Sequence, residues 1–285
     1  MNEQQYNFMA SASLHVRESI IRMSTDGGCF TGASLSCTDI IVYLYAHFLR
    51  ISPETINNPD RDYLFLSKGH DVPALYATLA ELGFIKKDRL LQHLNINDNI
   101  YWHPNTSIPG IEFHSGSLGH LLSVAMGVAY DCHMKKQDNK IVVIVGDGEL
   151  NEGSVWEGFL VASALKLSNL IVIVDRNKFQ ANMKTEELIP LEPLENKFSA
   201  FGWNTQRIDG HDFRAIESAL LSCNENNDMP QLIIADTVRG KGVPSIEERA
   251  DRWFCNFTHA DVENLVRELY GNESQELDSS IFHVR

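Results

Sequence analysis

The strongest constraint on the fold of this chain is a strand–helix–strand pattern between residues 141 and 180. Two short apolar runs, Ile141–Val145 and Leu170–Val174, are rich in β-branched residues and too short for helices, which is typical of buried parallel strands. Between them, apolar residues recur at helical spacing, namely Trp156, Phe159, Leu160, Ala164 and Leu167. Such a unit joins parallel strands by a right-handed crossover. The pattern predicts an α/β fold with a parallel sheet and helices on both faces.

Polar residues follow each of these two strands. Gly146-Asp147-Gly148 comes after the first, and Asp175-Arg176-Asn177 comes after the second. Ligands of parallel sheets bind beyond the carboxyl ends of the strands, so we expect Asp147 and Asn177 to meet at one site. Carboxylate and amide oxygens suit Mg²⁺, and glycines let a diphosphate approach the backbone. The residues alone therefore predict a magnesium–diphosphate site, although a single Gly-Asp-Gly turn is more often only a tight loop.

Composition narrows the class of protein. The chain has 285 residues, 44% hydrophobic and 22% charged, which is enough for one large core and a single domain over residues 1–285. Its net charge of −14 argues against nucleic-acid or anionic-membrane partners. The five cysteines form no CxxC pair, and the N-terminus has no signal-peptide pattern, so we expect reduced thiols in the cytoplasm. No apolar run reaches membrane-spanning length, and the polar tail, residues 271–285, is expected to be flexible or to cover a partner.

Local patterns give a coarse map of the remaining elements. We predict helices over residues 6–25, from about Pro73, over 84–94, after Gly119, over Leu194–Phe201 and over Ala260–Tyr270, and short strands at Tyr63–Leu66, Gln206–Ile208 and Gln231–Asp236. Ser36 with Asp39 resembles a capping box, which predicts a helix from Ser36 to about Leu49. Residues 95–113 form a loop long enough to suggest a functional role.

A family resemblance adds to this reasoning. The run GDGELNEGSVWEG, followed by an asparagine after the next strand, resembles the thiamine diphosphate signature of transketolases. Three further segments are similar to motifs of the same family: LSKGH at 66–70, HSGSLGH at 114–120 and IDGHD at 208–212. The resemblance covers nearly the whole chain, but it corresponds only to the diphosphate-binding half of a transketolase.

The resemblance implies a set of site residues. Asp147 and Asn177 would bind Mg²⁺, or Ca²⁺ or Mn²⁺ in its place, through their side chains, and Phe179 would bind it through its backbone carbonyl. His70 and His103 are the candidate catalytic residues, facing cofactor and substrate, although a lone histidine in a loop is more often structural. The implied thiamine diphosphate contacts are His70, Gly116, Ser117, Leu118, Gly146, Asp147, Gly148, Glu149, Asn177 and Lys241. Lys241 can equally be a solvated surface lysine, and Glu152 matches the family's dimer-contact glutamate.

Three positions depart from the family pattern. Phe30 stands where the family has a substrate-facing histidine, and Phe254 replaces a histidine that contacts diphosphate or substrate. His120 stands where glutamine is usual, and His259 is a candidate substitute for the lost imidazole at 254. Phenylalanine cannot bond a sugar hydroxyl, so we expect a less polar or specialised substrate, unless Phe30 is merely part of the core. His211 is expected to shape its loop rather than do chemistry.

The other half of a transketolase carries the pyrimidine-binding domain and the glutamate that activates the cofactor. We therefore expect a separate C-terminal transketolase-like partner subunit, with the cofactor at the interface of an α₂β₂ assembly. The implied activity is transfer of a two-carbon ketol, or acyl, unit from a donor to an aldehyde acceptor. Two alternatives stay open: a 2-oxo-acid-using acyl carboligase, and a non-catalytic regulatory paralogue of the same fold. The presence of Asp147, Asn177 and His70 argues against the second.

Overall fold

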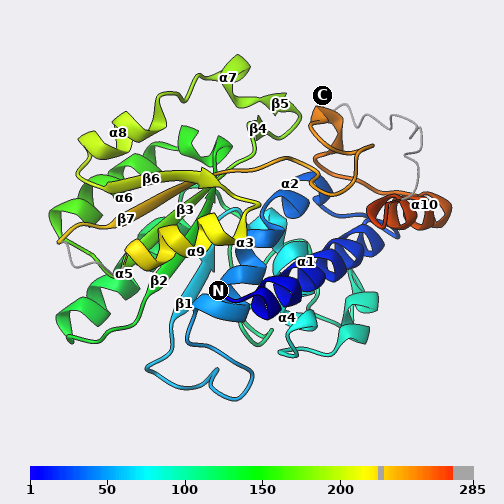
Figure 1. Cartoon of the computed structure of the whole chain (residues 1–285), viewed down its shortest axis with the longest axis horizontal. Coiled ribbons are helices and arrows are strands. Elements are labelled where there is room, and N and C mark those ends of the chain that lie inside the picture. Colours follow the sequence, from blue (N-terminus) through cyan, green and yellow to red (C-terminus); the bar gives the residue numbers. More distant parts are fainter. Residues whose placement is uncertain (224–227, 272–285) are drawn as a thin grey trace.

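Five parallel strands form the central sheet of this protein (Figure 1). The computed structural model describes residues 1–223 and 228–271. The strands lie in the order β1-β2-β3-β7-β6, and every neighbouring pair is parallel. Their bounds are Tyr63–Leu66 (β1), Ile141–Gly146 (β2), Leu170–Arg176 (β3), Asn204–Asp209 (β6) and Gln231–Asp236 (β7). The sequence predicted all five strands, three of them too short. It did not predict the small hairpin of β4 (Phe179–Gln180) and β5 (Met183–Lys184).

Helices cover both faces of the sheet, as the sequence predicted, because alternate residues of each strand point to opposite faces. On one face, Val142 and Ile144 of β2 join the core formed by α1 (Glu3–Met23), α3 (Thr38–Tyr43), α4 (Val72–Glu81), α9 (Phe213–Ser222) and α10 (His259–Leu269). On the other face, Val143 and Val145 join the core formed by α5 (Leu121–Met134), α6 (Gly153–Ala164) and α8 (Leu194–Ala200). Figure 1 shows the sheet between these two groups of helices.

The predicted capping box at Ser36 is wrong. Helix α2 already begins at Thr31 and ends at Ser36, and α3 begins at Thr38. Ser36 Oγ lies 2.7 Å from Ala33 O and from Asp175 Oδ2, so it faces the sheet instead of capping a helix. Asp39 binds the guanidinium of Arg17 at 2.6 and 2.9 Å. Partners from distant parts of the chain therefore replace the local capping bonds.

The remaining elements are short. They are η1 (Leu44–Phe48, a π-helical turn), η2 (Gly69–Asp71), η3 (Lys87–Gln92), η4 (Gly148–Asn151), α7 (Thr185–Leu188) and η5 (Ala250–Arg252). Within the described ranges, no helix combines the length and the apolar character needed to cross a membrane. Most of the predicted polar tail, residues 272–285, lies outside the described residues.

Candidate active site at the carboxyl ends of the strands

The strands β2, β3 and β7 end side by side, because Gly146 pairs with Asp175 and Arg176 pairs with Asp236. Just beyond them lies a cavity of about 200 Å³. It is lined by Ala33, Lys68, His70, Asp71, Leu118, Gly146, Asp147, Gly148, Glu149, Asn177, Phe179, Gln180, Ala181, Arg239 and Trp253. Eight of these were predicted site residues: His70, Leu118, Gly146, Asp147, Gly148, Glu149, Asn177 and Phe179. Of the other predicted site residues, Gly116, Ser117, His103 and Lys241 do not line this cavity.

Two consecutive backbone amides bring the side chains of Asp147 and Asn177 to the same place. The amide of Lys178 donates to Asp147 Oδ2 at 2.6 Å, and the amide of Phe179 donates to Asn177 Oδ1 at 3.0 Å. Both side chains are buried, at 1% and 5% exposure. Burial raises the pKa of Asp147 to about 6, although Arg176 and the Lys178 amide oppose the shift. The predicted convergence of these two oxygen ligands on one cavity is therefore present.

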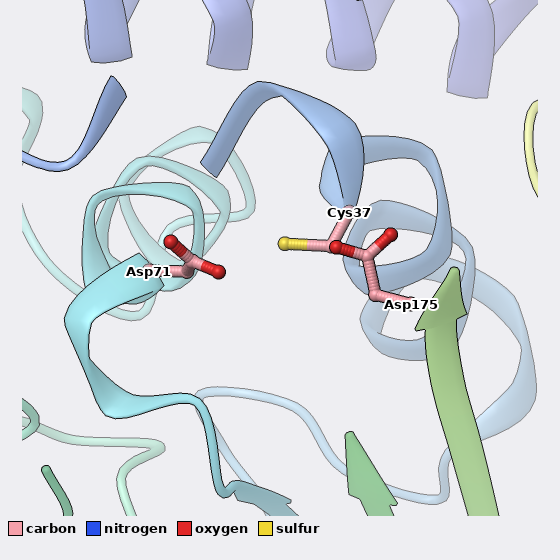
Figure 2. Close-up of side chains that lie close together, drawn as sticks. All are labelled: Cys37, Asp71 and Asp175. Atoms are coloured by element: carbon pink, nitrogen blue, oxygen red, sulfur yellow. The ribbon is translucent and has the colours of Figure 1, made fainter. Parts of the chain in front are cut away.

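A buried lysine occupies the floor of the cavity. Lys68 Nζ lies 2.6 Å from Asp71 Oδ2 and makes a short contact with Asp175 Oδ2. Figure 2 shows both carboxylates close to the thiol of Cys37, a grouping whose ligand atoms lie within 4.8 Å of one another. Burial alone disfavours the ammonium, but the two carboxylates outweigh it and raise the pKa of Lys68. Because the cation among these groups is already Lys68, we do not assign a metal to this cluster.

The second buried cation of the cavity is Arg239, which sequence reasoning missed. Its guanidinium is 1% exposed, lies 5.0 Å from the ring centroid of Phe179, and donates from Nη1 to Ala181 O at 2.5 Å. Within the described residues, Nε and Nη2 have no hydrogen-bond partner. Burial lowers the pKa of Arg239 to about 10, against the attraction of Asp71, so the group remains charged at neutral pH.

Lys241, the cation predicted for this loop, lies away from the cavity. Its carbonyl accepts a hydrogen bond from Arg17 Nε at 3.0 Å, and its amide donates to Val238 O. Between the two cations, Gly240 has φ +79°, which reverses the direction of the chain. Arg239 comes first after the strand and packs beside Gly32, where a Cβ would lie 2.9 Å from Arg239 Nε. The glycine at 32 therefore leaves room for the guanidinium.

Glu149 holds three loops of the site together. Its Oε1 accepts from Ser67 Oγ at 2.5 Å and from Gly119 N at 2.9 Å, and its Oε2 accepts from Gly146 N at 3.2 Å. Burial raises its pKa, while these hydrogen bonds oppose the shift. This predicted cofactor contact lines the cavity, but its contacts in the structure fix the Gly146 turn against the loops that follow β1 and precede α5.

An aromatic wall borders the cavity next to His70. We use this name for Phe30, Trp253 and Phe254, whose rings pack together with centroids 5.0 and 5.2 Å from that of Phe30. The His70 ring packs edge-on against Phe30 at 5.3 Å and Trp253 at 5.9 Å, and its Nε2 lies 3.6 Å from Asp71 Oδ1. Burial lowers the pKa of His70. The two phenylalanines that depart from the family pattern thus touch each other beside the site.

His103 lies on the far side of Phe30, with ring centroids 6.4 Å apart. Its carbonyl accepts from the Tyr76 hydroxyl at 2.9 Å. Gly116, at φ +138°, packs directly on its imidazole, because a Cβ there would lie 2.5 Å from His103 Cδ2. Burial lowers the pKa of His103. The structure therefore places both candidate catalytic histidines around Phe30, with only His70 lining the cavity.

Several other predicted residues have different surroundings. Ser117, His120 and Glu152 are exposed on the described surface. His211 bridges two loops, with Nδ1 2.8 Å from Asp39 Oδ2 and Nε2 accepting from Val238 N at 2.8 Å, consistent with a role in loop architecture. His259 is 78% exposed in its side chain and lies 3.3 Å from Asp26. It borders a separate cavity of about 460 Å³ between α1, η3 and α10, so it does not replace the imidazole missing at Phe254.

The residues of the 200 Å³ cavity fit a metal–diphosphate group. Asp147 and Asn177 supply hard oxygen atoms, which Mg²⁺ prefers. Arg239 supplies a buried guanidinium with unpaired N–H groups, which suits phosphate oxygens. An unpaired buried charge is costly unless a ligand compensates it, so the arrangement indicates an anionic ligand.

Comparisons with known proteins agree with this site. The family described as transketolase, thiamine diphosphate binding domain, matches residues 18–281. The chain is 37% identical to an apulose-4-phosphate transketolase subunit from Phocaeicola vulgatus, over 84% of this chain and 85% of that protein. It is 38% identical to a 6-deoxy-6-sulfo-D-fructose transketolase subunit from a Clostridium species, over 94% of this chain and 98% of that protein.

Solved structures give the same result. Transketolase from Campylobacter jejuni superimposes with a TM-score of 0.82 at 26% identity, and transketolase from Leishmania mexicana with 0.83 at 21% identity. Each alignment covers 99% of this chain but only 45% and 43% of the other, so the chain spans less than half the length of these solved transketolases. The chain belongs to the transketolase family, in which it corresponds to the thiamine diphosphate binding domain.

Proposed function

We propose that this chain is the diphosphate-binding subunit of a two-component, thiamine diphosphate-dependent transketolase-like enzyme. The reaction is transfer of a two-carbon ketol unit from a donor to an aldehyde acceptor. The observation that carries the proposal is the meeting of Asp147, Asn177 and the unpaired guanidinium of Arg239 in one cavity of a chain that belongs to this family.

Each side chain of the cavity has a role in this proposal. Asp147, Asn177 and the carbonyl of Phe179 hold Mg²⁺, and Arg239 binds the diphosphate oxygens. Thiamine diphosphate, when bound, supplies the nucleophilic carbon and the electron sink for breaking and forming the carbon–carbon bond. Burial lowers the pKa values of His70 and His103, so both imidazoles are neutral at pH 7. A neutral imidazole can accept a proton from a substrate hydroxyl or donate one N–H bond to a substrate oxygen.

The aromatic wall supports an unusual substrate. Phe30 and Phe254 present carbon edges where the family pattern has imidazoles, so substrate hydroxyls facing them would lose hydrogen bonds. Two similar proteins are named for the less common ketoses apulose 4-phosphate and 6-deoxy-6-sulfo-D-fructose. We propose that this subunit likewise takes a specialised donor or acceptor. The choice among such substrates is for assay.

The proposed partner is a C-terminal transketolase-like subunit that carries the pyrimidine-binding domain and the activating glutamate. Two similar proteins are named as individual subunits of an apulose-4-phosphate transketolase, which supports a second component. An α₂β₂ assembly would also cover the exposed apolar side chains of α5 and α6 and the residue after α6, which are Tyr130, Met134, Leu160, Val161 and Leu165. Their exposed fractions, from 39 to 62%, suit a face that a second copy of this chain covers.

The test begins with the full-length chain and its partner subunit, titrated with thiamine diphosphate by calorimetry with and without Mg²⁺. We expect metal-dependent binding that Asp147→Asn abolishes. The pair is then assayed with xylulose 5-phosphate, apulose 4-phosphate, 6-deoxy-6-sulfo-D-fructose and pyruvate as donors. Efficient turnover of xylulose 5-phosphate alone would contradict a specialised substrate. Turnover of pyruvate alone would favour the acyl carboligase, and absence of cofactor binding would favour the non-catalytic paralogue.

A further inference from the structure

Arg176 is a buried charge at the site that the proposed chemistry does not use. It is the last residue of β3 and stands between Asp175 and Asn177. These two neighbours share one side of the chain, since Asn177 Nδ2 donates to Asp175 Oδ2 at 3.1 Å. Arg176 therefore projects to the opposite side, where it is 2% exposed.

All three guanidinium nitrogens of Arg176 have partners. Nη1 donates to Asp147 Oδ2 at 2.8 Å and to Thr185 Oγ1 at 2.7 Å. Nη2 donates to Glu186 Oε1 at 2.7 Å, and Nε donates to Glu192 Oε1 at 3.3 Å. One rigid, planar group therefore ties the carboxylate of Asp147 to three positions in the segment 185–192.

The contacts of Asp147 show what this tie does. Its Oδ2 accepts from both Arg176 Nη1 and the Lys178 amide, which uses both lone pairs of that oxygen. Its Oδ1 accepts one bond, from the Gly148 amide at 2.8 Å. One lone pair is left, and it belongs to Oδ1. The carboxylate is thus held in one orientation with one oxygen available to a further ligand.

We propose that Arg176 is a positioning residue, which fixes Asp147 so that Oδ1 alone is presented to the metal ion. The inference rests on the proposed function, since it takes Asp147 as a metal ligand. Groups that orient a metal ligand typically change metal affinity about 10- to 100-fold when they are removed.

The shape of the guanidinium matters as well as its charge. Arginine presents five N–H groups in a fixed plane, whereas lysine presents one ammonium on a flexible stem. An ammonium at position 176 keeps the charge beside Asp147 but cannot hold Asp147, Glu186 and Glu192 at once. Lysine should therefore restore part of the metal affinity that a neutral side chain loses.

The experiment measures Mn²⁺ binding by electron paramagnetic resonance, on the complex of the full-length chain with its partner, saturated with thiamine diphosphate. The variants are Arg176→Met and Arg176→Lys, with Arg207→Met as matched control. Arg207 also binds Glu192, at 3.2 and 3.3 Å, and is 30% exposed, but it does not contact Asp147. We expect a loss of Mn²⁺ affinity of at least about 10-fold for Arg176→Met, a smaller loss for Arg176→Lys, and a change below twofold for Arg207→Met.

Equal losses for Arg176→Met and Arg207→Met, or no loss in either, would overturn the inference while leaving the proposed function intact. If Arg176→Met fails to fold, Arg176→Lys decides, since an unchanged Mn²⁺ affinity there would also overturn it. A wild-type complex that binds no Mn²⁺ with thiamine diphosphate would instead overturn the proposed function, and this inference with it.

Discussion

Replacing Arg239 by methionine should weaken thiamine diphosphate binding without destabilising the cofactor-free chain. Its Nε and Nη2 are buried without hydrogen-bond partners among the described residues, so the charge is uncompensated before a ligand binds. Arg239→Met removes one bond, to Ala181 O, and the contact with the Phe179 ring, each contributing about 1 kcal/mol. It also removes a desolvation penalty of several kcal/mol. We therefore expect the free energy of unfolding of the cofactor-free chain to stay equal or rise.

The effect on binding has the opposite sign. A hydrogen bond to a charged partner contributes about 1.5–3 kcal/mol, and Arg239 has two nitrogens free to bond the diphosphate. Since such contributions are not additive, we take about 3 kcal/mol for the pair, which corresponds to an increase in Kd of about 100-fold. Calorimetric titration of the complex with thiamine diphosphate at saturating Mg²⁺ measures this change, and thermal unfolding of the cofactor-free chain measures the other.

The matched control is Lys241→Met, which removes a cation of the same loop that lies outside the cavity. We expect its Kd for thiamine diphosphate to change less than twofold. The reasoning is refuted if Lys241→Met weakens binding as much as Arg239→Met. It is also refuted if Arg239→Met lowers the free energy of unfolding by more than about 2 kcal/mol, as loss of a structural ion pair would.

The same structure supports three other predictions. Because the pKa of Asp147 is raised to about 6, protons compete with the metal below that pH, and Mn²⁺ affinity measured between pH 5 and 6 should fall towards tenfold per unit; in the metal-free chain the raised pKa means that protonation favours folding, so a constant affinity would contradict the shift. Arg17→Met leaves the buried carboxylate of Asp39 without its bidentate partner and should lower the free energy of unfolding by about 3–5 kcal/mol in a urea titration, against less than about 1 kcal/mol for Arg22→Met on the surface. Phe254→His should raise kcat/KM for xylulose 5-phosphate, by up to about tenfold for one new hydrogen bond; an unchanged ratio to the preferred donor would show that this ring does not face substrate.

The central sheet and the metal-ligand pair could be predicted from the sequence because their signals are local. Runs such as Ile141–Val145 are apolar and β-branched without interruption, which only a strand buried on both faces requires. Parallel strands then force their carboxyl ends to one edge, so Asp147 and Asn177 had to meet once the strands were assigned. No knowledge of side-chain packing was needed.

Residues that depend on packing could not be predicted in this way. Arg239 and Lys241 are separated by one glycine, and only the left-handed turn at Gly240 and the space beside Gly32 decide which cation enters the cavity. Ser36 carries a capping pattern, but its hydroxyl faces the carboxylate of Asp175, from a strand 139 positions further along the chain. Arg176 gave no signal, because its four acceptors come together only after β3, α7 and the segment that follows have folded.

The two cations that line the cavity differ in one respect that separates scaffold from ligand binding. Lys68 is matched within the protein by Asp71 and Asp175, so its charge is compensated whether or not a ligand is present. Arg239 has a carbonyl and an aromatic ring but no carboxylate in hydrogen-bond contact, and two of its nitrogens have no partner among the residues described. Since a buried unpaired guanidinium persists in a fold only if something else compensates it, the site as a whole is arranged for an anion that the chain itself does not supply. Lys68 thus holds the floor of the site in place, and Arg239 is the cation left to bind the diphosphate.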